Sequence, residues 1–432
     1  MIQRLQLRNF KSWREADIEF GSITIFFGAN SSGKTALLQF LLLLKQTVEH
    51  PDPTIPLFWG DEHSPVELGG YLDAIYRHDA ERKLEWRLSW QLEDAIELLN
   101  ATGNQLSHRA SVAYASDTAV VEHVAYTFAE VEVGLQRAED AYEVVCEGYA
   151  LKRTRGQPAR ISSPIKCYGF PEQAINRYQN ADFLARLGLE FTRLFERVYY
   201  LGPLREHPKR QYRWAGAKPR DVGFKGELTT DALIASQQMG KTVRRKGRRG
   251  SQTVQEAVAE QLQRMGLVSQ FRLREIAPKS RIYEVQLRRT PDCPEVAFTD
   301  IGFGVSQVLP VITLCYYVPE RSIVILEQPE IHLHPAVQMA LADAIIDAVK
   351  TRSIQVIIES HSEHFLLRLQ RRIAEKELTP NDARLYFCEL QGGESHLLPL
   401  QVDNSGNILN YPPDFFGDPL QETLERRKAA LK

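Results

Sequence analysis

Apolar and polar residues follow two different periods along the chain, and each period predicts a different kind of segment. Near the N-terminus, short apolar stretches indicate strands at residues 2–7, 16–20 and 23–27. The third stretch is apolar throughout, as in a strand that is covered on both faces of a sheet. Residues 36–48 are apolar on most sides of a helix, which predicts a buried helix. We therefore expect a strand, a loop and a helix in immediate succession.

Strict alternation of apolar and polar residues begins at residue 84. Alternation returns at residues 124–128, and residues 142–151 are also strand-like. This period of two predicts an antiparallel β lobe inserted into the fold. Residues 175–199 have a helical pattern. No heptad pattern persists for several repeats, so we expect no long coiled coil.

The C-terminal part of the chain returns to alternating strands and helices. Strands are expected at residues 322–326 and 354–358, and helices at residues 335–349 and 362–374. This rhythm predicts a parallel sheet with crossover helices. The fold class is therefore α/β with an inserted antiparallel lobe.

The same patterns suggest a division of the chain into five parts. These are a first part of an α/β head at residues 1–80, an inserted β lobe with a helical segment at 81–200, a loop-rich connector at 201–295, a second part of the head at 296–380, and a small C-terminal domain at 381–432. Within the connector, Thr253 is expected to cap a helix that ends at Gly266.

Composition narrows the class of protein only modestly. The 432 residues are 43% hydrophobic and 25% charged with a net charge of −2, which suits a globular protein and does not demand nucleic acid. The five cysteines show no CxxC spacing, so neither a zinc knuckle nor a disulfide framework is indicated. The opening residues are too polar for a signal peptide, and no apolar run approaches the ~20 residues of a membrane span. We expect a cytoplasmic protein without a membrane partner.

Residues 28–35 fit the pattern G-x-x-x-x-G-K-[S/T] at every fixed position, between the third predicted strand and the first helix. Backbone N–H groups of such a loop wrap an anion, and the helix that follows adds its positive end. Lys34 would place its charge on the β- and γ-phosphates, and Thr35 would offer its hydroxyl to Mg²⁺. The sequence therefore predicts ATP and Mg²⁺ as ligands. The expected binding residues are Gly28, Asn30, Ser31, Gly33, Lys34 and Thr35.

The predicted strand at residues 322–326 leads into an acidic motif. A carboxylate at the C-terminal end of a parallel strand lies where open α/β sheets bind ligands, so Glu327 is expected to reach Mg²⁺ through water. His361 follows the next strand, where a neutral imidazole would hydrogen-bond the γ-phosphate. Glu330 has two interpretations: a catalytic base, or an acid at a helix start that the helix dipole favours.

Two further motifs lie near the acidic strand. His332 and His334 offer two nitrogens to a metal, but no other ligand cluster is nearby. We therefore favour a turn before a helix whose first residue is Pro335. Residues 299–309 form a Gly-rich turn that opens a helix and is a second candidate anion site.

The order of these motifs resembles the OLD/RecF/SMC-like branch of the ABC-type ATPases. The resemblance rests on LQLRNFKSW at residues 5–13, the phosphate loop, GFGVSQ at 302–307, EQPEIHLHP at 327–335 and SHSEH at 360–364. The chain looks most like the AAA-family ATPases of bacterial defence and genome-maintenance islands. Residues 386–416 are similar to the uncharacterised C-terminal domain of many of them, whereas residues 80–195 show hardly any similarity.

The resemblance implies an ABC-type P-loop NTPase head that closes into a head-to-tail dimer around ATP. The signature-like turn would touch the partner's γ-phosphate through Gly302, Gly304 and Ser306. This turn departs from the family at Gly302, which stands where a serine is usual. The contact would therefore fall to backbone N–H groups or to Ser306.

Two further departures concern catalysis. Glu327 stands where the metal-binding acid is usually Asp, and Gln328 stands where a glutamate usually polarises the attacking water. A glutamine orients water but cannot accept its proton, and general-base catalysis contributes about 10²–10⁴-fold. Hydrolysis is therefore expected to be slow, or to use another base such as Glu330. The candidate catalytic residues are Gln328, Glu330 and His361.

Function is expected to depend on a partner. The chain lacks the Asp-x-Asp pair of nuclease-bearing relatives, so the first hypothesis is a sensor or scaffold ATPase in anti-phage defence, a homodimer or higher oligomer that controls a separate effector, such as a nuclease. The second is a DNA-binding repair or recombination ATPase of the RecF/SMC type, and the third a nucleotide-binding scaffold with little or no hydrolysis. A transporter motor is disfavoured by the long insertion. DNA contact would use the basic residues Arg244, Arg245, Lys246, Arg248 and Arg249, which a solvated loop also explains.

Overall fold

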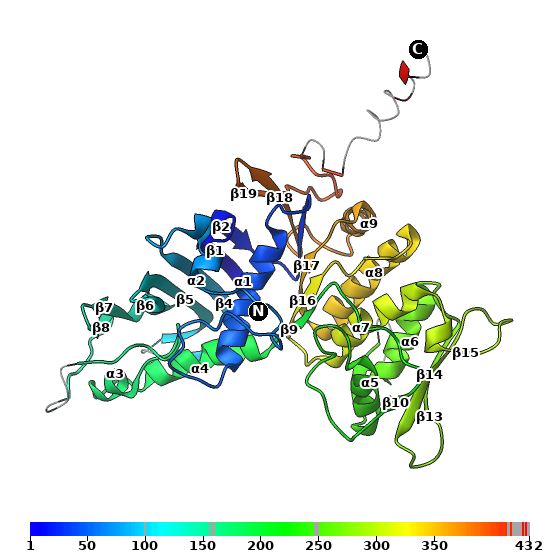
Figure 1. Ribbon diagram of the computed structural model, residues 1–432, viewed down its shortest axis with the longest axis horizontal. Coiled ribbons are helices and arrows are strands. Elements are labelled where there is room, and N and C mark those ends of the chain that lie inside the picture. The colour runs from blue at the N-terminus through cyan, green and yellow to red at the C-terminus, as the bar shows by residue number, and fades with distance from the viewer. Residues whose placement is uncertain are drawn as a thin grey trace.

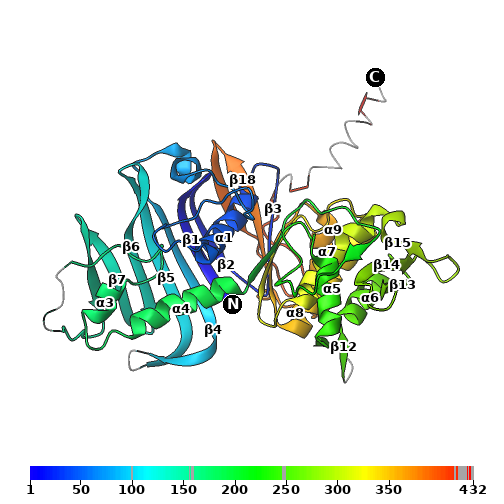
Figure 2. The same ribbon diagram turned by 60° about the horizontal axis from the view of Figure 1, so that its bottom comes forward.

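Two β-sheets lie side by side in the computed structural model, a seven-stranded antiparallel sheet and a six-stranded sheet that is mainly parallel (Figure 1). The structure describes residues 1–98, 101–154, 156, 160–245, 250–412, 415, 416, 426, 428 and 429. Helices α1 (Lys34–Glu49) and α4 (Phe183–Glu196) pack against the antiparallel sheet, and α1 also contacts the parallel one (Figure 2). Across the described part of the chain, no helix combines the length and apolar character needed to cross a membrane.

The antiparallel sheet confirms the predicted β lobe and extends it. In spatial order its strands are β2 (Trp13–Glu19), β1 (Ile2–Phe10), β4 (Leu84–Leu98), β5 (Ala101–Ala115), β6 (Thr118–Phe128), β7 (Val131–Ala138) and β8 (Ala141–Glu147). Alternate residues such as Trp86 and Trp90 are buried on one face, and the intervening ones face outward. Since β1 and β4 pair directly, the division that we expected at residue 80 runs through one sheet.

The parallel sheet separates two hydrophobic cores. In spatial order its strands are β19 (Glu394–Pro399), β18 (Ala383–Gln391), β3 (Ile23–Gly28), β17 (Gln355–Glu359), β16 (Ile323–Glu327) and β9 (Val198–Leu201), of which only β19 is antiparallel to its neighbour. In β16, Ile323 and Ile325 face the core shared with the antiparallel sheet, whereas Val324 and Leu326 face the core under the C-terminal helices. Burial on both faces explains the continuous apolar runs of the sequence.

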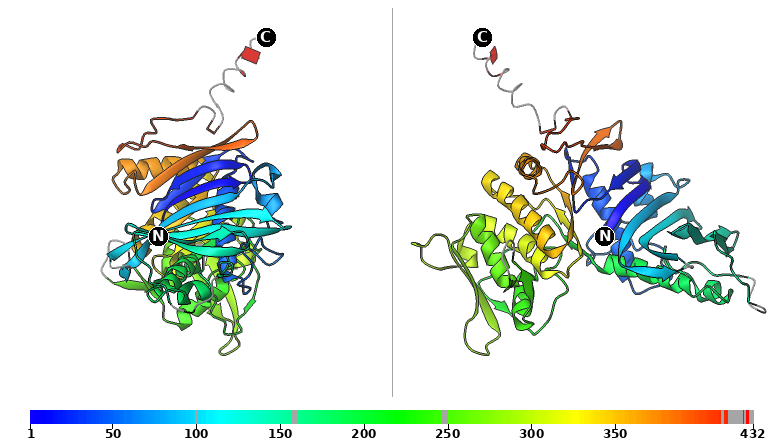
Figure 3. Two further views of the ribbon diagram at one scale, coloured as in Figure 1. Left: turned by 90° about the vertical axis from the view of Figure 1, so that its left-hand side faces the viewer. Right: turned by 180° about the vertical axis from the view of Figure 1, so that it is seen from behind.

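The predicted C-terminal domain contributes its two strands to this sheet. Strand β18 pairs in parallel with β3, and Leu385 and Phe387 are buried in the same core as β3. The hairpin of β18 and β19 lies beside the N-terminal strands, where β19 contacts β2 (Figure 3). Residues 383–399 are therefore part of the head and not of a separate domain.

Helices complete the second core. They are α5 (Thr229–Gln238), α6 (Val254–Arg264), α7 (Phe303–Tyr317), α8 (Pro335–Arg352) and α9 (Glu363–Ala374), and two short helices, α2 (Tyr71–Ala74) and α3 (Glu172–Asn176), lie elsewhere. The longest described helix has 18 residues, which agrees with the absence of a long coiled coil from the described chain. The predicted cap is confirmed, because Thr253 and Glu256 form a reciprocal capping box at the start of α6.

Six short strands lie in the described part of the predicted connector or directly after it. They are β10 (Tyr212–Arg213), β11 (Thr242–Arg244), β12 (Ser251–Thr253), β13 (Gln270–Glu275), β14 (Ile282–Arg288) and β15 (Val296–Ala297). Arg244 and Arg245 are exposed on the β11–β12 hairpin, whereas Lys246, Arg248 and Arg249 lie outside the described residues.

One predicted helix boundary is wrong. The helical pattern at residues 175–199 contains α4, but the chain turns into strand β9 at Val198. Every residue of β9 is buried because the strand lies at the edge of the parallel sheet between two cores. Sheet pairing with β16 therefore overrides the local helical pattern.

Candidate functional site

The loop between β3 and α1 has the backbone of an anion-binding turn. Three of its residues have positive φ: Gly28 at 141°, Ser31 at 62° and Gly33 at 93°. A Cβ at Gly28 would lie 2.1 Å from the carbonyl oxygen of Cys388, so only glycine fits against β18. The exposed Asn30 and Ser31 form the tip of the loop. The sequence prediction of a strand, this loop and a helix is confirmed.

Lys34 is held inside the loop. Its Nζ donates to the carbonyl oxygens of Gly28 at 3.1 Å and Ala29 at 2.6 Å. Burial lowers the pKa of Lys34, although the nearby Glu359 carboxylate opposes the shift. An anionic phosphate oxygen is a stronger partner for this ammonium than a neutral carbonyl.

Segments from both ends of the chain support the loop at Gly33. The indole Nε1 of Trp13 donates to the Gly33 carbonyl at 2.9 Å, and the hydroxyl of Ser395 donates to that of Ser12 at 2.7 Å. A Cβ at Gly33 would lie 2.4 Å from the Ser395 hydroxyl oxygen. The loop is therefore fixed by β2 and β19 as well as by its own strand and helix.

Two carboxylates meet at the C-terminal ends of β16 and β17. Glu327 and Glu359 are register partners, and both are buried. Burial and then the charge of Glu359 raise the pKa of Glu327 to about 7. The hydroxyl of Thr35 donates to Oε2 of Glu359 at 2.7 Å, which joins the phosphate loop to the acidic strand ends.

His361 completes this edge of the sheet. Burial lowers the pKa of His361, and so does the positive charge of Lys34, while the Gly28 carbonyl partly offsets both effects. The imidazole is therefore neutral near pH 7, as the sequence interpretation required. The structure thus brings together Lys34, Thr35, Glu327 and His361 from three separate segments.

Gln328 and Glu330 line a depression of about 410 Å³ together with His361. Gln328 is half-buried with φ of 42°, and its backbone N–H donates to the Glu359 carbonyl at 2.9 Å. Glu330 is buried, and its Oε1 accepts from the Ser360 hydroxyl and the His361 N–H, each at 2.8 Å. Its Oε2 is buried without a hydrogen-bond partner, and burial raises the pKa of Glu330.

The helix-start interpretation of Glu330 is wrong. Helix α8 begins at Pro335, and its first turn contains no acidic residue. The N-cap is His334, whose Nδ1 accepts from the Ala336 N–H at 3.3 Å. Glu330 lies four residues before this cap, in the turn that joins β16 to α8. Pro335 as the first helical residue is confirmed.

A histidine metal site receives no support. Among the residues that the structure describes, no group of three or more His, Cys, Asp or Glu side chains could hold a metal ion. Glu359 lies beside the phosphate loop, bonded to the Thr35 hydroxyl, and Glu327 is its neighbour on β16. Hard oxygen donors of this kind suit Mg²⁺, which takes its other ligands from phosphates and water.

The signature-like turn lies at the N-terminus of α7. Gly302 is the exposed N-cap residue, whereas Ser306 is buried with 5% exposure. A Cβ at Gly304 would approach Leu333 and Leu267 at 3.7 and 3.8 Å. The surface of this turn is therefore its backbone at Gly302, and the Ser306 side chain faces inward.

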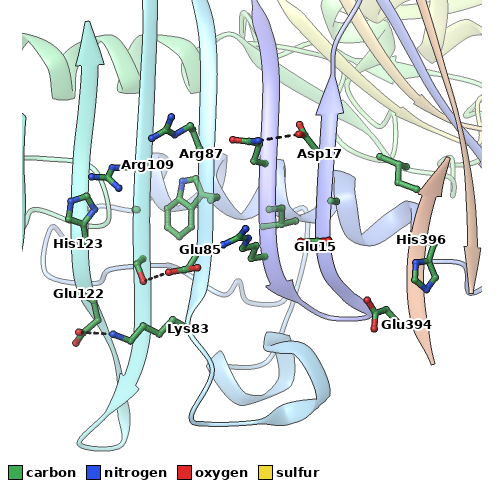
Figure 4. Close-up of a pocket in the computed structure, with 18 of the residues that line it drawn as sticks. Glu15, Asp17, Lys83, Glu85, Arg87, Arg109, Glu122, His123, Glu394 and His396 are labelled. Carbon is green, nitrogen blue, oxygen red and sulfur yellow. Dashed lines mark hydrogen bonds and ion pairs between the residues drawn. The ribbon is translucent and has the colours of Figure 1, made fainter. Parts of the chain in front are cut away.

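A larger depression, of about 1070 Å³, lies on the outer face of the antiparallel sheet (Figure 4). Some of its polar side chains pair with one another: Lys83 with Glu122 at 3.2 Å, and Gln6 with Asp17 at 3.1 Å. Gln6, Leu7 and Arg8 of the N-terminal LQLRNFKSW segment line it, but no residue of the phosphate loop or of the acidic and histidine motifs does. This surface has the mixed, self-neutralised charge of a solvated sheet face.

At the edge of the sheet, the sequence interpretation overlooked Glu359 and left the role of Arg205 open. Glu359 precedes His361 in the motif, but its role depends on its register with Glu327. Arg205 follows β9, and the structure buries its guanidinium near Glu327 and Glu330. The acidic residue at a strand end was a usable signal for Glu359, whereas nothing local signalled the burial of Arg205.

These features define a P-loop nucleotide-binding head of the α/β class. The sequence model of a family described as AAA ATPase domain matches residues 1–106 and 245–366, more than half of the chain. The chain belongs to this AAA ATPase domain family. A second family, described as protein of unknown function (DUF3696), matches residues 378–425. A comparison with curated proteins gives no match.

Solved structures with a similar fold include heads of SMC proteins. The SMC head bound to the C-terminal winged-helix domain of ScpA is 12% identical, with 93% of this chain and 98% of that chain covered and a TM-score of 0.47. The SMC head domain from Thermotoga maritima is 14% identical, with coverage of 93% and 99% and a TM-score of 0.42. The SMC head from Pyrococcus furiosus, bound to the C-terminal domain of ScpA, is 11% identical, with coverage of 100% and 99% and a TM-score of 0.47.

Proposed function

We propose that this protein is an ABC-type ATPase that binds Mg-ATP, closes into a homodimer around it, and uses slow hydrolysis to control a separate effector protein. The observation that carries the proposal is the convergence of Lys34, Thr35, Glu327, Glu359 and His361 at one edge of the parallel sheet. This edge is where open α/β sheets bind ligands.

The residues fit a magnesium-bound triphosphate. The loop at residues 28–35 supplies inward N–H groups and the Lys34 ammonium for the phosphates. Thr35, Glu327 and Glu359 would hold Mg²⁺, which supplies positive charge that neutralises the phosphates and relieves the repulsion between the two acids. Neutral His361 would hydrogen-bond the terminal phosphate.

Hydrolysis needs an oriented water and a proton acceptor. Gln328 borders the depression and can orient the water through its amide, but it cannot take the proton. We assign that step to Oε2 of Glu330, which is buried without a partner, in a carboxyl whose pKa burial has raised. The other oxygen of Glu330, Oε1, accepts from the His361 N–H. A carboxylate held in this way suits slow turnover.

Dimerisation places the turn of one subunit over the phosphates of the other. The proposal is supported by the motif resemblance and by the exposed Gly302 at the N-terminus of α7, a 15-residue helix whose positive end suits an anion. The contact is assigned to backbone N–H groups near Gly302 and Gly304. The Ser306 side chain is not assigned this contact, because it is buried.

The effector and the setting follow from the family resemblance, an analogy of fold and motif. We propose a role in anti-phage defence, in which the ATP-bound dimer holds or releases a separate effector such as a nuclease. Purification of the tagged protein from its own operon, followed by identification of bound proteins, tests this role. Recovery of the ATPase alone, with and without ATP, would contradict it.

DNA binding is the second candidate function, because Arg244 and Arg245 are exposed on a projecting hairpin. Phosphate contacts make affinity fall steeply with salt. Salt-dependent duplex binding that is lost in Arg244→Gln/Arg245→Gln would favour this function. Duplex binding that these substitutions do not change would reject the hairpin as its site.

The binding step has a direct test. Calorimetry with ATP and Mg²⁺ should give saturable binding to the wild-type protein. Lys34→Ala should abolish it, whereas Lys376→Ala on an exposed turn should not change it. Equal binding by wild type and Lys34→Ala would reject the proposed site.

A further inference from the structure

Arg205 lies near the carboxylates of Glu327 and Glu330. Strand β9 pairs in parallel with β16 so that Leu201 is opposite Leu326. The chain therefore leaves β9 beside Glu327, and Arg205 follows four residues later. Arg205 ends the segment YLGPLR at residues 200–205, which is similar to a segment of the resembled ATPases, and the catalytic roles assigned above do not use it.

The guanidinium of Arg205 is buried without a hydrogen-bond partner. All three of its nitrogens, Nε, Nη1 and Nη2, are inaccessible to solvent and make no hydrogen bond. Burial lowers the pKa of Arg205 to about 10, while Tyr200, Glu327 and Glu330 oppose the shift, so the group stays charged at neutral pH. A buried cation with five unused N–H donors is costly unless an anion completes it.

The neighbouring carboxylates leave room for such an anion. Oε1 of Glu330 already accepts two hydrogen bonds from residues 360 and 361, and Glu327 interacts with the Tyr200 hydroxyl. Neither acid forms a hydrogen bond with Arg205. The planar fork of a guanidinium matches the oxygens of a phosphoryl group.

We propose that Arg205 binds the terminal phosphate of the nucleotide and so distinguishes ATP from ADP. This inference rests on the proposed function, because it takes the triphosphate to lie between the phosphate loop and Glu327. Lys34 and the loop hold the inner phosphates in either nucleotide. Arg205 reaches the same site from the opposite side of β16, where only the terminal phosphate extends.

The loop that carries Arg205 is tied to the helix of the signature-like turn. The Gly202 N–H donates to the Phe224 carbonyl at 2.8 Å, and the Glu206 N–H donates to the Lys225 carbonyl at 2.9 Å. Gly226 follows Lys225 directly, and its backbone packs closely against α7: a Cβ at Gly226 would lie 2.8 Å from Pro310. These contacts connect the loop of Arg205 to α7, whose N-cap is Gly302.

The test compares nucleotides in the full-length protein. We expect Arg205→Gln to weaken binding of a non-hydrolysable ATP analogue about 10- to 100-fold, as for the loss of hydrogen bonds to a charged group, and to change ADP affinity less than about threefold. Arg205→Lys should recover part of the loss. Lys209→Gln removes an exposed cation of the same loop and should bind both nucleotides like wild type.

Hydrogen exchange at residues 302–306 provides a second readout. In the wild type, the ATP analogue should protect these amides and ADP should not, and saturating analogue should fail to protect them in Arg205→Gln. Equal losses for ATP analogue and ADP, or no loss for either, would mean that Arg205 pairs structurally with Glu330, and would overturn the inference while the proposed function stands. If the wild-type protein bound neither nucleotide, both the inference about Arg205 and the proposed function would be rejected.

Discussion

Glu327 and Glu359 face each other at the ends of two neighbouring parallel strands, and the charge of the second helps to raise the pKa of the first to about 7. The Thr35 hydroxyl donates to Glu359 at 2.7 Å, so this pair is directly connected to the phosphate loop. Two buried acids at neighbouring strand ends disfavour double ionisation, and a divalent cation is the group that reverses this penalty. In the proposed function, this pair links nucleotide binding to metal binding.

Loss of the second acid should weaken the response to magnesium. We expect Glu359→Gln to raise the Mg²⁺ concentration for half-maximal ATP hydrolysis about 10- to 100-fold, because one negative charge beside the metal is removed while the strand pairing is kept. Glu363→Gln, which changes an exposed acid on the adjacent helix, is the matched control. An unaltered Mg²⁺ requirement in Glu359→Gln would exclude that acid from the metal site.

The same pair makes the stability of the metal-free protein depend on pH. The pKa of Glu327 is raised from 4.5 to about 7, so its protonated form stabilises the fold below pH 4.5 and that contribution is lost as pH rises through 7. In EDTA without nucleotide, Glu327→Gln should exceed wild type in free energy of unfolding at pH 8 by up to about 3 kcal/mol. The difference should vanish near pH 5. Urea unfolding at both pH values measures it, and a difference that grows toward low pH would contradict the assigned shift.

The head, but not its limits, could be predicted from the sequence. Local sequence patterns were sufficient to predict the phosphate loop, the parallel strands and the Thr253 cap, because each of these features depends on residues that are close together in the sequence. The order of strands is not local. Strand β18 lies beside β3 although some 350 residues separate them, and only pairing in space shows that the C-terminal segment belongs to the head.

The candidate site shows the same limit. Lys34, Glu327 and His361 were found because each follows a recognisable strand. Glu359 gains its role from register with Glu327, and Arg205 from burial beside a strand that the helical pattern concealed. Ser306 was expected to contact a partner, but its side chain is buried.

The position of β18 predicts that damage to the C-terminal segment disables the phosphate loop. Leu385→Asp would bury a charge in the core shared with β3 and should cost more than about 3 kcal/mol, with loss of ATP binding. Leu390→Asp, at a position on the same strand with 48% exposure, should leave stability and binding near wild type. Urea unfolding and calorimetry test both variants. Normal ATP binding by Leu385→Asp would show that the segment folds independently of the head.

Glu330 is expected to serve hydrolysis more than binding. Glu330→Gln keeps one oxygen for the Ser360 hydroxyl and the His361 N–H but removes the proton acceptor. Turnover should fall about 10²-fold or more, with ATP affinity changed less than about threefold. Single-turnover hydrolysis with saturating protein separates the two effects. Turnover within a few-fold of wild type would restrict Glu330 to holding residues 360 and 361 in place.

Gln328 should limit the rate of ATP hydrolysis because its amide cannot accept a proton. Its half-buried side chain borders the same depression as Glu330 and His361, and its backbone is fixed by the bond to the Glu359 carbonyl. Gln328→Glu adds a carboxylate at the position where relatives of this type use one, so turnover should rise about 10- to 100-fold without a change in ATP affinity. Gln328→Ala, which can neither orient water nor accept a proton, should fall below wild type and is the matched control. Steady-state phosphate release measures all three proteins. If Gln328→Glu were no faster than wild type, the slow step would lie outside proton transfer, in dimer opening or product release, and the glutamine would not explain slow turnover.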